Sequence, residues 1–294
     1  MQDEHRNSQP YPWVARILSI ICVAICIGLM GRGEFPSWEF YAKFGYLSPE
    51  SIWRGSYWSL FTSTLVHLEI WHLAFNVYWL WILGGRLEQS IGSLRFLAFF
   101  IAAGTIASSF QLAVSGTTGI GASGALYALF GFMWLARDRY PEFRQILDPR
   151  TVWLFLIWLV ACYVITHFGD FRIGNTAHLS GLLFGCAVAG VRMGRSRAPA
   201  AIAGLLLLVL GAVIPLFWSP WSIPWLSEQA YAAHSAKEYN IALDYYSQIL
   251  EREKDNAWAL QHRGYIYQAL DEPSKAATDL RRAFELEPSL EKTP

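Results

Sequence analysis

The sequence contains little charge. Asp, Glu, Lys and Arg make up 16% of its 294 residues, whereas roughly 25% is usual in soluble domains. Basic and acidic side chains number 23 each, so the net charge is zero. That balance gives no support to nucleic-acid binding, which needs a basic surface. Because hydrophobic residues make up 54% of the chain, the composition predicts a membrane protein.

Cysteine is scarce as well, and its spacing carries no signal. The four cysteines all lie inside apolar stretches, at Cys22, Cys26, Cys162 and Cys186. Cysteine behaves there as a small hydrophobic residue. No spacing matches a disulfide framework or a set of metal ligands, so we expect neither a metal nor another cofactor.

Long apolar runs follow one another from residue 13 to about residue 218 and then stop. A helix needs about 20 such residues to cross a bilayer. Glu69 is the only acidic residue within the runs, so the few polar side chains in them are functional candidates. The runs predict seven transmembrane helices, at residues 13–31, 65–83, 96–115, 121–136, 152–168, 176–191 and 200–218.

Arginine and lysine in the loops predict the orientation of these helices, because short loops rich in these cations face the cytoplasm. One side of the predicted bundle carries most of them, namely Arg6, Arg16, Arg86, Arg95, Arg137, Arg139, Arg144, Arg150, Arg192, Arg195 and Arg197. The other side carries fewer, namely Arg32, Lys43, Arg54 and Arg172. We therefore expect a cytoplasmic N-terminus and, after seven spans, an extracytoplasmic C-terminal segment.

The last quarter of the chain is polar and repeats itself at an offset of 34 residues. Side chains of similar packing type recur at that offset, as in Ala242 and Ala276. This period is typical of tetratricopeptide repeats, each a pair of packed helices. The second copy ends with Pro288, as the family usually does, whereas the first has Lys254. The tail resembles two such repeats, and a helical hairpin without a ligand is the alternative.

Residues 119–131 place one hydroxyl among small residues at the head of an apolar run. Ser123 lies between Gly121 and Gly124, and small residues let another helix backbone come close. His178, in the sixth span, stands beside a stripe of small residues at Ala177, Gly181, Gly185 and Ala189. Packing of the two small faces would bring Ser123 within hydrogen-bond reach of His178.

A serine beside a histidine is typical of nucleophilic catalysis, because an imidazole can remove the hydroxyl proton. Attack on a peptide carbonyl creates an oxyanion that hydrogen-bond donors stabilise. His72 and Asn76 lie four residues apart and share a helix face. With the Ser123 backbone amide they are the predicted oxyanion donors, and Tyr127 is predicted to stack on His178. Apart from Glu69 near the start of the second span, no intramembrane Asp or Glu is available as a third member, so we expect a dyad.

Each of these residues also has a structural interpretation. Serines in membrane helices commonly bond to a carbonyl of the preceding turn. Asn76 or His178 alone often joins two helices by a hydrogen bond, and Tyr127 alone would be a packing aromatic. The combination is more specific than its members, because all of them lie in the short spans of one bundle.

A set of residues with a recurring order runs through the first two thirds of the chain. It comprises Trp53-Arg54, His67, His72, Asn76, the segment 84–88, Gly121 to Gly124, Tyr127, Ala177-His178, Gly181 and Gly185. This set resembles the rhomboid family of intramembrane serine proteases, over about residues 13–197. The resemblance implies a six-helix core with a water-filled cavity open to the extracytoplasmic side. No element of the catalytic pattern is missing, which argues against the inactive members of the superfamily.

We therefore predict an all-α polytopic membrane bundle followed by a small helical-hairpin domain. The expected parts are a tail at 1–12, a six-helix protease core at 13–197, a seventh transmembrane helix at 198–220 and two tetratricopeptide repeats at 221–294. The resemblance is to bacterial members with a seventh helix, so the expected location is the bacterial plasma membrane.

The predicted activity is cleavage of transmembrane segments of membrane proteins. The predicted roles are nucleophile for Ser123, general base for His178, oxyanion stabilisation for His72 and Asn76, and support from Tyr127, Gly121, Gly124 and Gly181. The expected partners are transmembrane substrates, the lipid bilayer and a protein bound to the repeats, and not nucleic acid. The alternative is a non-catalytic membrane adaptor that binds transmembrane helices and docks a partner on its repeats.

Overall fold

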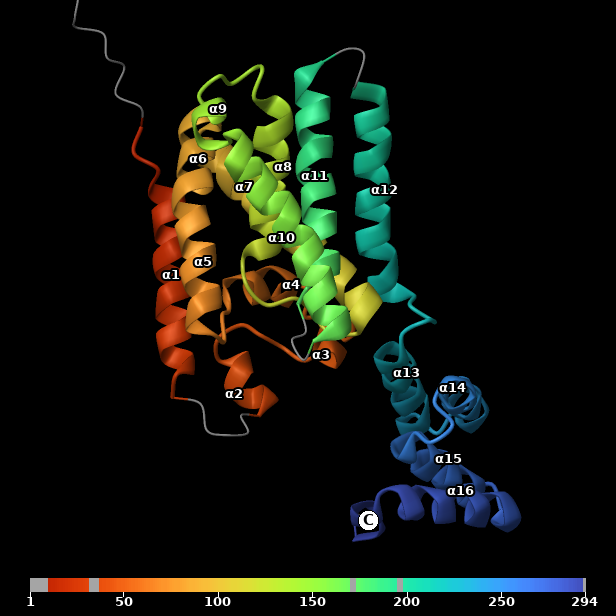
Figure 1. Cartoon of the computed structure of the whole chain (residues 1–294). Coiled ribbons are helices and arrows are strands. Elements are labelled where there is room, and N and C mark those ends of the chain that lie inside the picture. Colours follow the sequence, from red (N-terminus) through yellow and green to blue (C-terminus); the bar gives the residue numbers. More distant parts are fainter. Residues whose placement is uncertain (1–9, 32–36, 170–172, 195–197, 293–294) are drawn as a thin grey trace, which may run out of the picture. The chain divides into compact units, whose positions relative to one another are not determined.

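The computed structural model describes residues 10–31, 37–169, 173–194 and 198–292 (Figure 1). Over these ranges every regular element is a helix and no strand occurs. The chain divides into two compact units after Phe217, three residues before the predicted boundary. Most of the predicted tail at 1–12 lies outside the described residues, as do five of the loop arginines used for orientation, namely Arg6, Arg32, Arg172, Arg195 and Arg197.

The first unit is a bundle of apolar helices. They are α1 (Trp13–Leu29), α2 (Trp38–Ala42), α3 (Pro49–Trp53), α4 (Ser59–Thr62), α5 (Ile70–Trp79), α6 (Gly85–Ile91), α7 (Ser93–Ser115), α8 (Ser123–Ala136), α9 (Phe143–Ile146), α10 (Pro149–Phe168), α11 (Asn175–Met193) and α12 (Ala198–Phe217). A 3-10 turn, Ser63–Leu65, follows α4, and a π-helical turn, Leu80–Gly84, joins α5 to α6. Helix α8 is buried over almost its whole length, so it forms the core on which the other helices pack.

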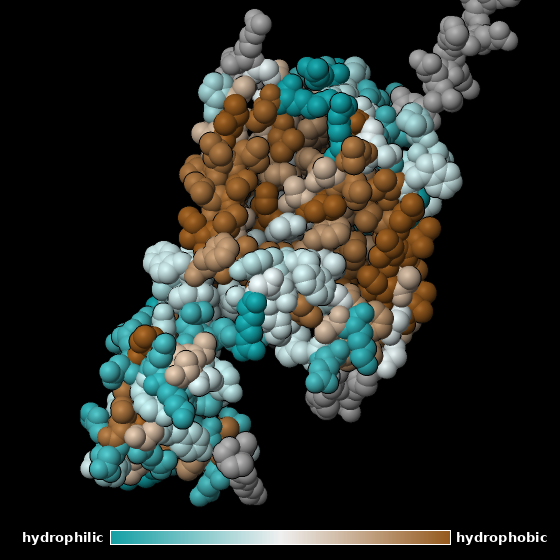
Figure 2. Space-filling model, turned by 180° about the vertical axis from the view of Figure 1, so that it is seen from behind, coloured by the Kyte–Doolittle hydropathy of each residue, from teal (hydrophilic) through white to brown (hydrophobic). Residues whose placement is uncertain are grey.

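Several of these helices are suited to a bilayer. Helices α7, α10, α11 and α12 are long and apolar enough to cross a membrane, and α1 and α8 are shorter apolar helices. All six lie within three residues of predicted spans. Large apolar side chains on α10 and α12 point outward and are exposed, among them Trp153, Ile157, Val160, Leu206 and Leu210. Figure 2 shows a broad hydrophobic surface on the opposite face of this unit from that seen in Figure 1, and lipid covers such surfaces without the penalty that water would impose.

The second predicted span, at 65–83, differs from the structure at both ends. Residues 66–69 lie outside the helix, and α5 begins only after Glu69, whose backbone is extended. At the other end the helix does not stop at residue 83 but continues through the π-helical turn into α6. The hydropathy pattern could locate this helix but not its limits.

Close packing against α1 explains why two consecutive glycines do not end this helix. A Cβ added to Gly84 would lie 3.4 Å from the Ala15 Cβ, and one added to Gly85 would lie 3.2 Å from a guanidinium nitrogen of Arg16. Glycine normally weakens a helix by about 1 kcal/mol. Here both glycines lie against α1, and this tertiary packing holds the helix together.

Glu88 fixes the start of α1. Its buried carboxylate accepts hydrogen bonds from the backbone amides of Val14 (3.0 Å) and Ala15 (2.8 Å) and from the hydroxyl of Ser93 (2.6 Å). The first amides of a helix lack intrahelical acceptors and attract negative charge. The carboxylate from α6 therefore serves as a cap that α1 does not have in its own sequence.

The second unit consists of two helical hairpins. Its helices are α13 (Ile223–Ser235), α14 (Tyr239–Arg252), α15 (Ala257–Ala269) and α16 (Pro273–Leu286), followed by a 3-10 turn, Pro288–Lys292. Helices α13 and α15 begin 34 residues apart, as do α14 and α16. Ala242 and Ala276, paired by the sequence offset, are both buried. The two hairpins are thus copies of one unit of structure.

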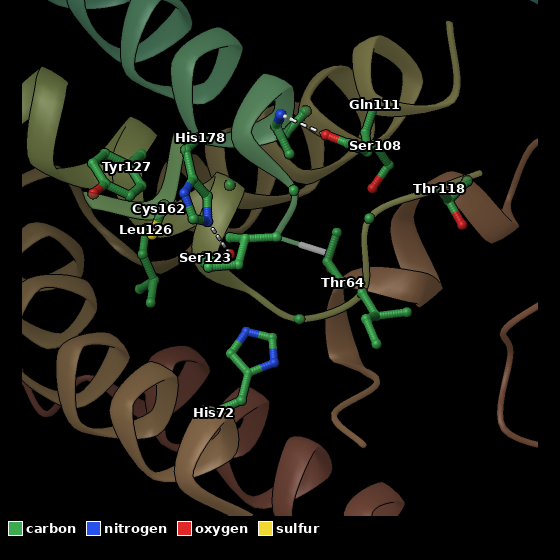
Figure 3. Close-up of a pocket in the computed structure, with 18 of the residues that line it drawn as sticks. Thr64, His72, Ser108, Gln111, Thr118, Ser123, Leu126, Tyr127, Cys162 and His178 are labelled. Carbon is green, nitrogen blue, oxygen red and sulfur yellow. Dashed lines mark hydrogen bonds between the residues drawn. The ribbon is translucent and has the colours of Figure 1, made fainter. Parts of the chain in front are cut away.

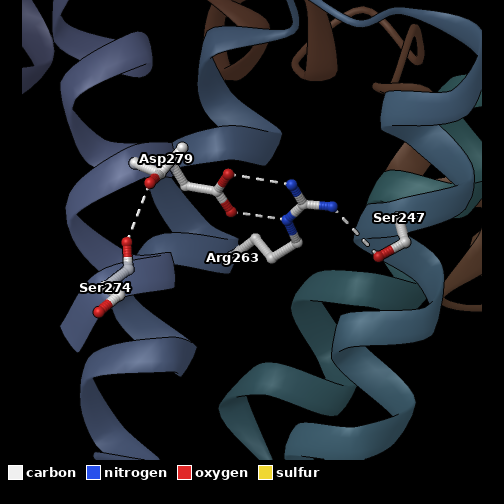
Figure 4. A network of polar contacts seen from close by, with 5 residues as sticks. Ser247, Arg263, Ser274 and Asp279 are labelled. Atoms are coloured by element: carbon white, nitrogen blue, oxygen red, sulfur yellow. Dashed lines mark hydrogen bonds and ion pairs between the residues drawn. The ribbon is translucent and has the colours of Figure 1, made fainter. Parts of the chain in front are cut away.

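An ion pair joins the helices of the second hairpin (Figure 4). Arg263 of α15 donates from Nε to Asp279 Oδ2 at 2.7 Å and from Nη2 to Asp279 Oδ1 at 3.0 Å. Its third nitrogen, Nη1, donates to Ser247 Oγ of α14 at 3.3 Å. A two-point guanidinium–carboxylate contact fixes geometry better than a single bond, so Arg263 ties three helices of this unit together.

Candidate active site

Ser123 is the first residue of α8. The loop that leads to it ends in Gly121, with φ +91°, a conformation that side chains other than glycine rarely adopt. The amide of Gly121 donates to the carbonyl of Ser63 at 3.2 Å, which fixes the loop to the 3-10 turn. Because the first amides of a helix have no intrahelical acceptor, the Ser123 N–H remains available beside its own hydroxyl.

Small residues allow α8 and α11 to pack in direct backbone contact. A Cβ on Gly181 would collide with the carbonyl oxygen of Gly124, and one on Gly185 would collide with that of Ala128. A Cβ on Gly131 would likewise lie 2.5 Å from the carbonyl oxygen of Leu182. The two small faces predicted from the sequence are therefore the faces that meet.

This packing brings Ser123 and His178 together (Figure 3). His178, in the first turn of α11, is 3% exposed, and its Nε2 lies 2.8 Å from Ser123 Oγ. The Tyr127 ring lies 4.7 Å from the His178 ring at an interplanar angle of 31°. The Tyr127 hydroxyl donates to the Phe155 carbonyl of α10 at 2.9 Å. Tyr127 thus limits how the imidazole can turn.

The second imidazole nitrogen, Nδ1 of His178, has no hydrogen-bond partner among the described residues. If Nε2 accepts the proton of Ser123, the neutral ring must carry its hydrogen on Nδ1. In a triad that hydrogen would be donated to a carboxylate. Among the described residues, His178 therefore contacts Ser123 through Nε2 while its Nδ1 meets no carboxylate.

His72 and Asn76 project from α5 toward the loop before Ser123. A Cβ on Gly121 would collide with the His72 ring and would lie 3.3 Å from Asn76 Nδ2. Glycine at 121 is therefore required twice, by its φ angle and by the approach of these two side chains. The structure brings both predicted oxyanion donors against Gly121, two residues before Ser123.

His67 was part of the rhomboid resemblance, but the sequence assigned it no role. It is fully buried, and its Nε2 accepts from the Ala122 amide at 3.4 Å and lies 3.1 Å from Asn76 Nδ2. Its Nδ1 lies 3.2 Å from the Leu65 carbonyl oxygen, which requires a hydrogen on Nδ1 and leaves Nε2 as the acceptor. His67 therefore orients Asn76 and holds the loop before Ser123.

Gln111 of α7 is a further site residue that the sequence did not single out. Its Oε1 accepts from the Ala177 amide at 3.2 Å, one residue before His178. It satisfies one of the free amides at the start of α11. The presence of a glutamine in an apolar span was the signal that could have found it.

A cavity of about 680 Å³ surrounds these groups. Its volume is in the range of ligand-binding pockets. Polar and apolar side chains line it from α5, α7, α8, α10 and α11, including His72, Gln111, Ser123, Trp158, Cys162 and His178 (Figure 3). The hydroxyl of Ser123 is thus open to a cavity large enough for several side chains and water.

Comparison with known proteins gives one consistent result. A family model described as "Rhomboid domain" matches residues 54–195. The chain is 32% identical over 196 residues to "Rhomboid protease GlpG" of Klebsiella pneumoniae subsp. pneumoniae, covering 65% of this chain and 67% of that protein. The protein of the same name from Klebsiella pneumoniae strain 342 matches with the same identity and coverage.

Proposed function

The chain belongs to the rhomboid family, and on that premise we propose that it is an intramembrane serine endopeptidase. The observation that carries the proposal is the 2.8 Å contact between Ser123 Oγ and His178 Nε2 at the wall of a cavity. Serine is a weak nucleophile until a base removes its proton. A buried imidazole at hydrogen-bond distance meets that need.

In the proposed mechanism Ser123 Oγ attacks the peptide carbonyl of the substrate while its proton moves to His178 Nε2. The resulting oxyanion accepts hydrogen bonds from His72, Asn76 and the Ser123 amide, and such donors typically contribute about 10²- to 10³-fold in rate. His178 then gives the proton to the leaving amine, and an acyl-enzyme ester remains. Water activated by His178 hydrolyses that ester and regenerates Ser123.

The substrates we propose are transmembrane segments of other proteins. Ser123 is the first residue of the apolar helix α8, in a bundle whose outer surface is hydrophobic. A substrate chain that reaches Ser123 therefore comes from the bilayer. A peptide bond in a regular helix has its carbonyl occupied and its backbone covered by side chains. The substrate must therefore be extended at the bond that is cut, and the volume of the cavity allows this.

The alternative function, a membrane adaptor without catalysis, has less support. An adaptor gives no reason for a serine and a histidine to share a hydrogen bond inside an apolar bundle, because buried polar groups there are costly. It also gives no reason for His67 to hold Asn76 beside that pair. These two polar contacts favour catalysis.

We expect a fluorophosphonate probe to label the wild-type protein and to lose at least about 10³-fold in labelling rate in Ser123→Ala, because the nucleophile is gone. Ser180→Ala is the matched control. Ser180 is a buried serine of α11 whose hydroxyl donates to Thr176 of its own helix. Mass spectrometry of the labelled protein identifies the modified residue. A folded wild type that is not labelled, or equal labelling of wild type and Ser123→Ala, would falsify the proposal.

We further propose that the N-terminus is cytoplasmic and that the second unit is extracytoplasmic in a bacterial plasma membrane. The orientation rests on the arginines of every second loop, among them Arg86, Arg95, Arg137, Arg139 and Arg192, and on the positive-inside rule. The location rests on the resemblance to bacterial relatives.

The second unit, in this proposal, consists of two tetratricopeptide repeats that dock substrates or an adaptor protein. The support is the 34-residue offset between corresponding helices, which is the period of that repeat. Deletion of residues 221–294 is expected to lower cleavage of native membrane substrates by about tenfold, the effect of losing a modest docking interaction. Fluorophosphonate labelling of Ser123 should stay unchanged. Unchanged cleavage of every native substrate after the deletion would contradict the docking role.

A further inference from the structure

Helix α12 lies at the edge of the first unit and packs on it with one narrow face. Only Ala212 and Pro215 of α12 are fully buried, and most other side chains are exposed. Near its C-terminal end, however, two polar side chains from other parts of the chain bind its backbone. The Ser109 hydroxyl of α7 donates to the carbonyl of Ala212, and Trp53 Nε1 of α3 donates to the carbonyl of Pro215 at 3.2 Å.

The bond made by Ser109 reaches the backbone of another helix. Several helix hydroxyls of this bundle bond instead to their own preceding turn, as in Ser19 to Ala15 at 2.8 Å and Thr166 to Cys162 at 2.9 Å, the common arrangement for membrane serine and threonine. Ser109 is 1% exposed and instead donates across to α12. A hydroxyl that forgoes its local acceptor ties two helices together.

The hydrogen bond from Trp53 satisfies the carbonyl of Pro215, which has no donor within α12. Pro215 lies in the last turn of α12, where the final carbonyls have no intrahelical donor. The neighbouring Leu216 packs against a small core of Ile52, Leu60 and Leu112. The end of α12 is therefore attached to α3 by a hydrogen bond and by apolar contact.

The other side of the same segment of α7 holds the active site. Ser108, next to Ser109, shares a hydrogen bond with Ser63 Oγ at 3.3 Å. The Ser63 carbonyl accepts from the Gly121 amide, two residues before Ser123. Gln111 holds the start of α11 through the Ala177 amide, one residue before His178. One turn of α7 thus lies between α12 and both members of the dyad.

We propose that α12 is a positioning element for the catalytic pair, acting through Ser109 and Trp53. The carbonyls of Ala212 and Pro215 fix the positions of α7 and α3. Residues of α7 in turn bind the 3-10 turn that holds the loop before Ser123, and they bind the start of α11, which carries His178. The inference rests on the proposed proteolytic function and deepens it, because neither residue touches the cavity and both act through others. Removing either contact should slow the chemical step more than it weakens substrate binding.

The test uses the full chain in proteoliposomes with a transmembrane substrate. Ser109→Ala and Trp53→Phe are each expected to lower kcat by about three- to tenfold, the effect of one lost hydrogen bond, with KM changed by less than about twofold. Ser109→Thr, which keeps the hydroxyl, should restore kcat. The controls are Ser19→Ala, a buried serine bonded within its own helix, and Trp58→Phe, an exposed tryptophan between α3 and α4.

Two glycines of α12 provide an independent pair of variants. A Cβ on Gly211 would lie 2.7 Å from the ring of Phe110 on α7, whereas a Cβ on Gly204 would meet nothing within 4 Å. Gly211→Val should therefore displace α12 from α7 and lower kcat as Ser109→Ala does. Gly204→Val should leave it unchanged.

Three results would overturn the positioning role. They are wild-type kcat in both Ser109→Ala and Trp53→Phe, an equal loss in Ser109→Ala and Ser109→Thr, or a rise in KM with kcat unchanged. In each case fluorophosphonate labelling of Ser123 in the wild type would leave the proteolytic function standing. A wild type that neither labels nor cleaves would overturn both proposals.

Discussion

His178→Ala is expected to lower kcat/KM by about 10³- to 10⁶-fold, the range seen when one member of a serine–histidine pair is removed. The nucleophile remains, but no other described side chain is hydrogen-bonded to Ser123 Oγ to take its proton. The cavity keeps its other lining residues, so KM should change by less than about tenfold. Single-turnover cleavage of a transmembrane substrate, with binding measured separately, tests both parts.

His167→Ala is the matched control for this variant. His167 is an exposed histidine near the end of α10, so its loss removes the same chemical group from the same protein away from Ser123. We expect wild-type kinetics from it. If His178→Ala kept a fluorophosphonate labelling rate within about tenfold of wild type, His178 would not be the base that activates Ser123.

The sequence could locate the long apolar helices of the first unit because the bilayer imposes a narrow range of length and composition on them. It could also predict that α8 and α11 pack together, since glycine and alanine every four residues leave few other faces for close contact. The positions of Ser123 and His178 on those faces then made their meeting an inference from spacing. Local sequence patterns were sufficient to predict these features because one constraint dominated each, namely the thickness of the bilayer or the need for small residues at a close helix contact.

The supports of the site could not be predicted in the same way. His67 acts from a segment that leaves the helix after Leu65, and hydropathy does not distinguish such a segment from the span that follows. The role of Glu88 depends on where the start of α1 lies against α6. Contacts of this kind join residues far apart in the chain, so they follow from tertiary packing and not from any repeat in the sequence.

Gly181→Ala is expected to remove nearly all activity although it adds only one methyl group. The added Cβ would meet the carbonyl oxygen of Gly124, a backbone atom that no side-chain rotation can move away. Helices α8 and α11 must then separate. Adding a methyl group to a well-packed core typically lowers the free energy of unfolding by about 1–3 kcal/mol. Separation also lengthens the contact between Ser123 and His178, so labelling should fall by at least about 10²-fold, because small misplacements of reacting groups have effects of that size.

Gly204→Ala is the control for Gly181→Ala, because it makes the same change in a membrane helix where a Cβ meets nothing within 4 Å. Thermal unfolding and fluorophosphonate labelling, measured on both variants, separate the two effects. Wild-type labelling by a folded Gly181→Ala would show that the backbone contact does not set the distance between the catalytic groups. The expected loss, in contrast, would occur with every reactive group still present, since Ser123, His178, His72 and Asn76 are untouched. The reactivity of Ser123 would then depend on the glycines that let α11 approach α8. The same small residues would serve both helix packing and catalysis.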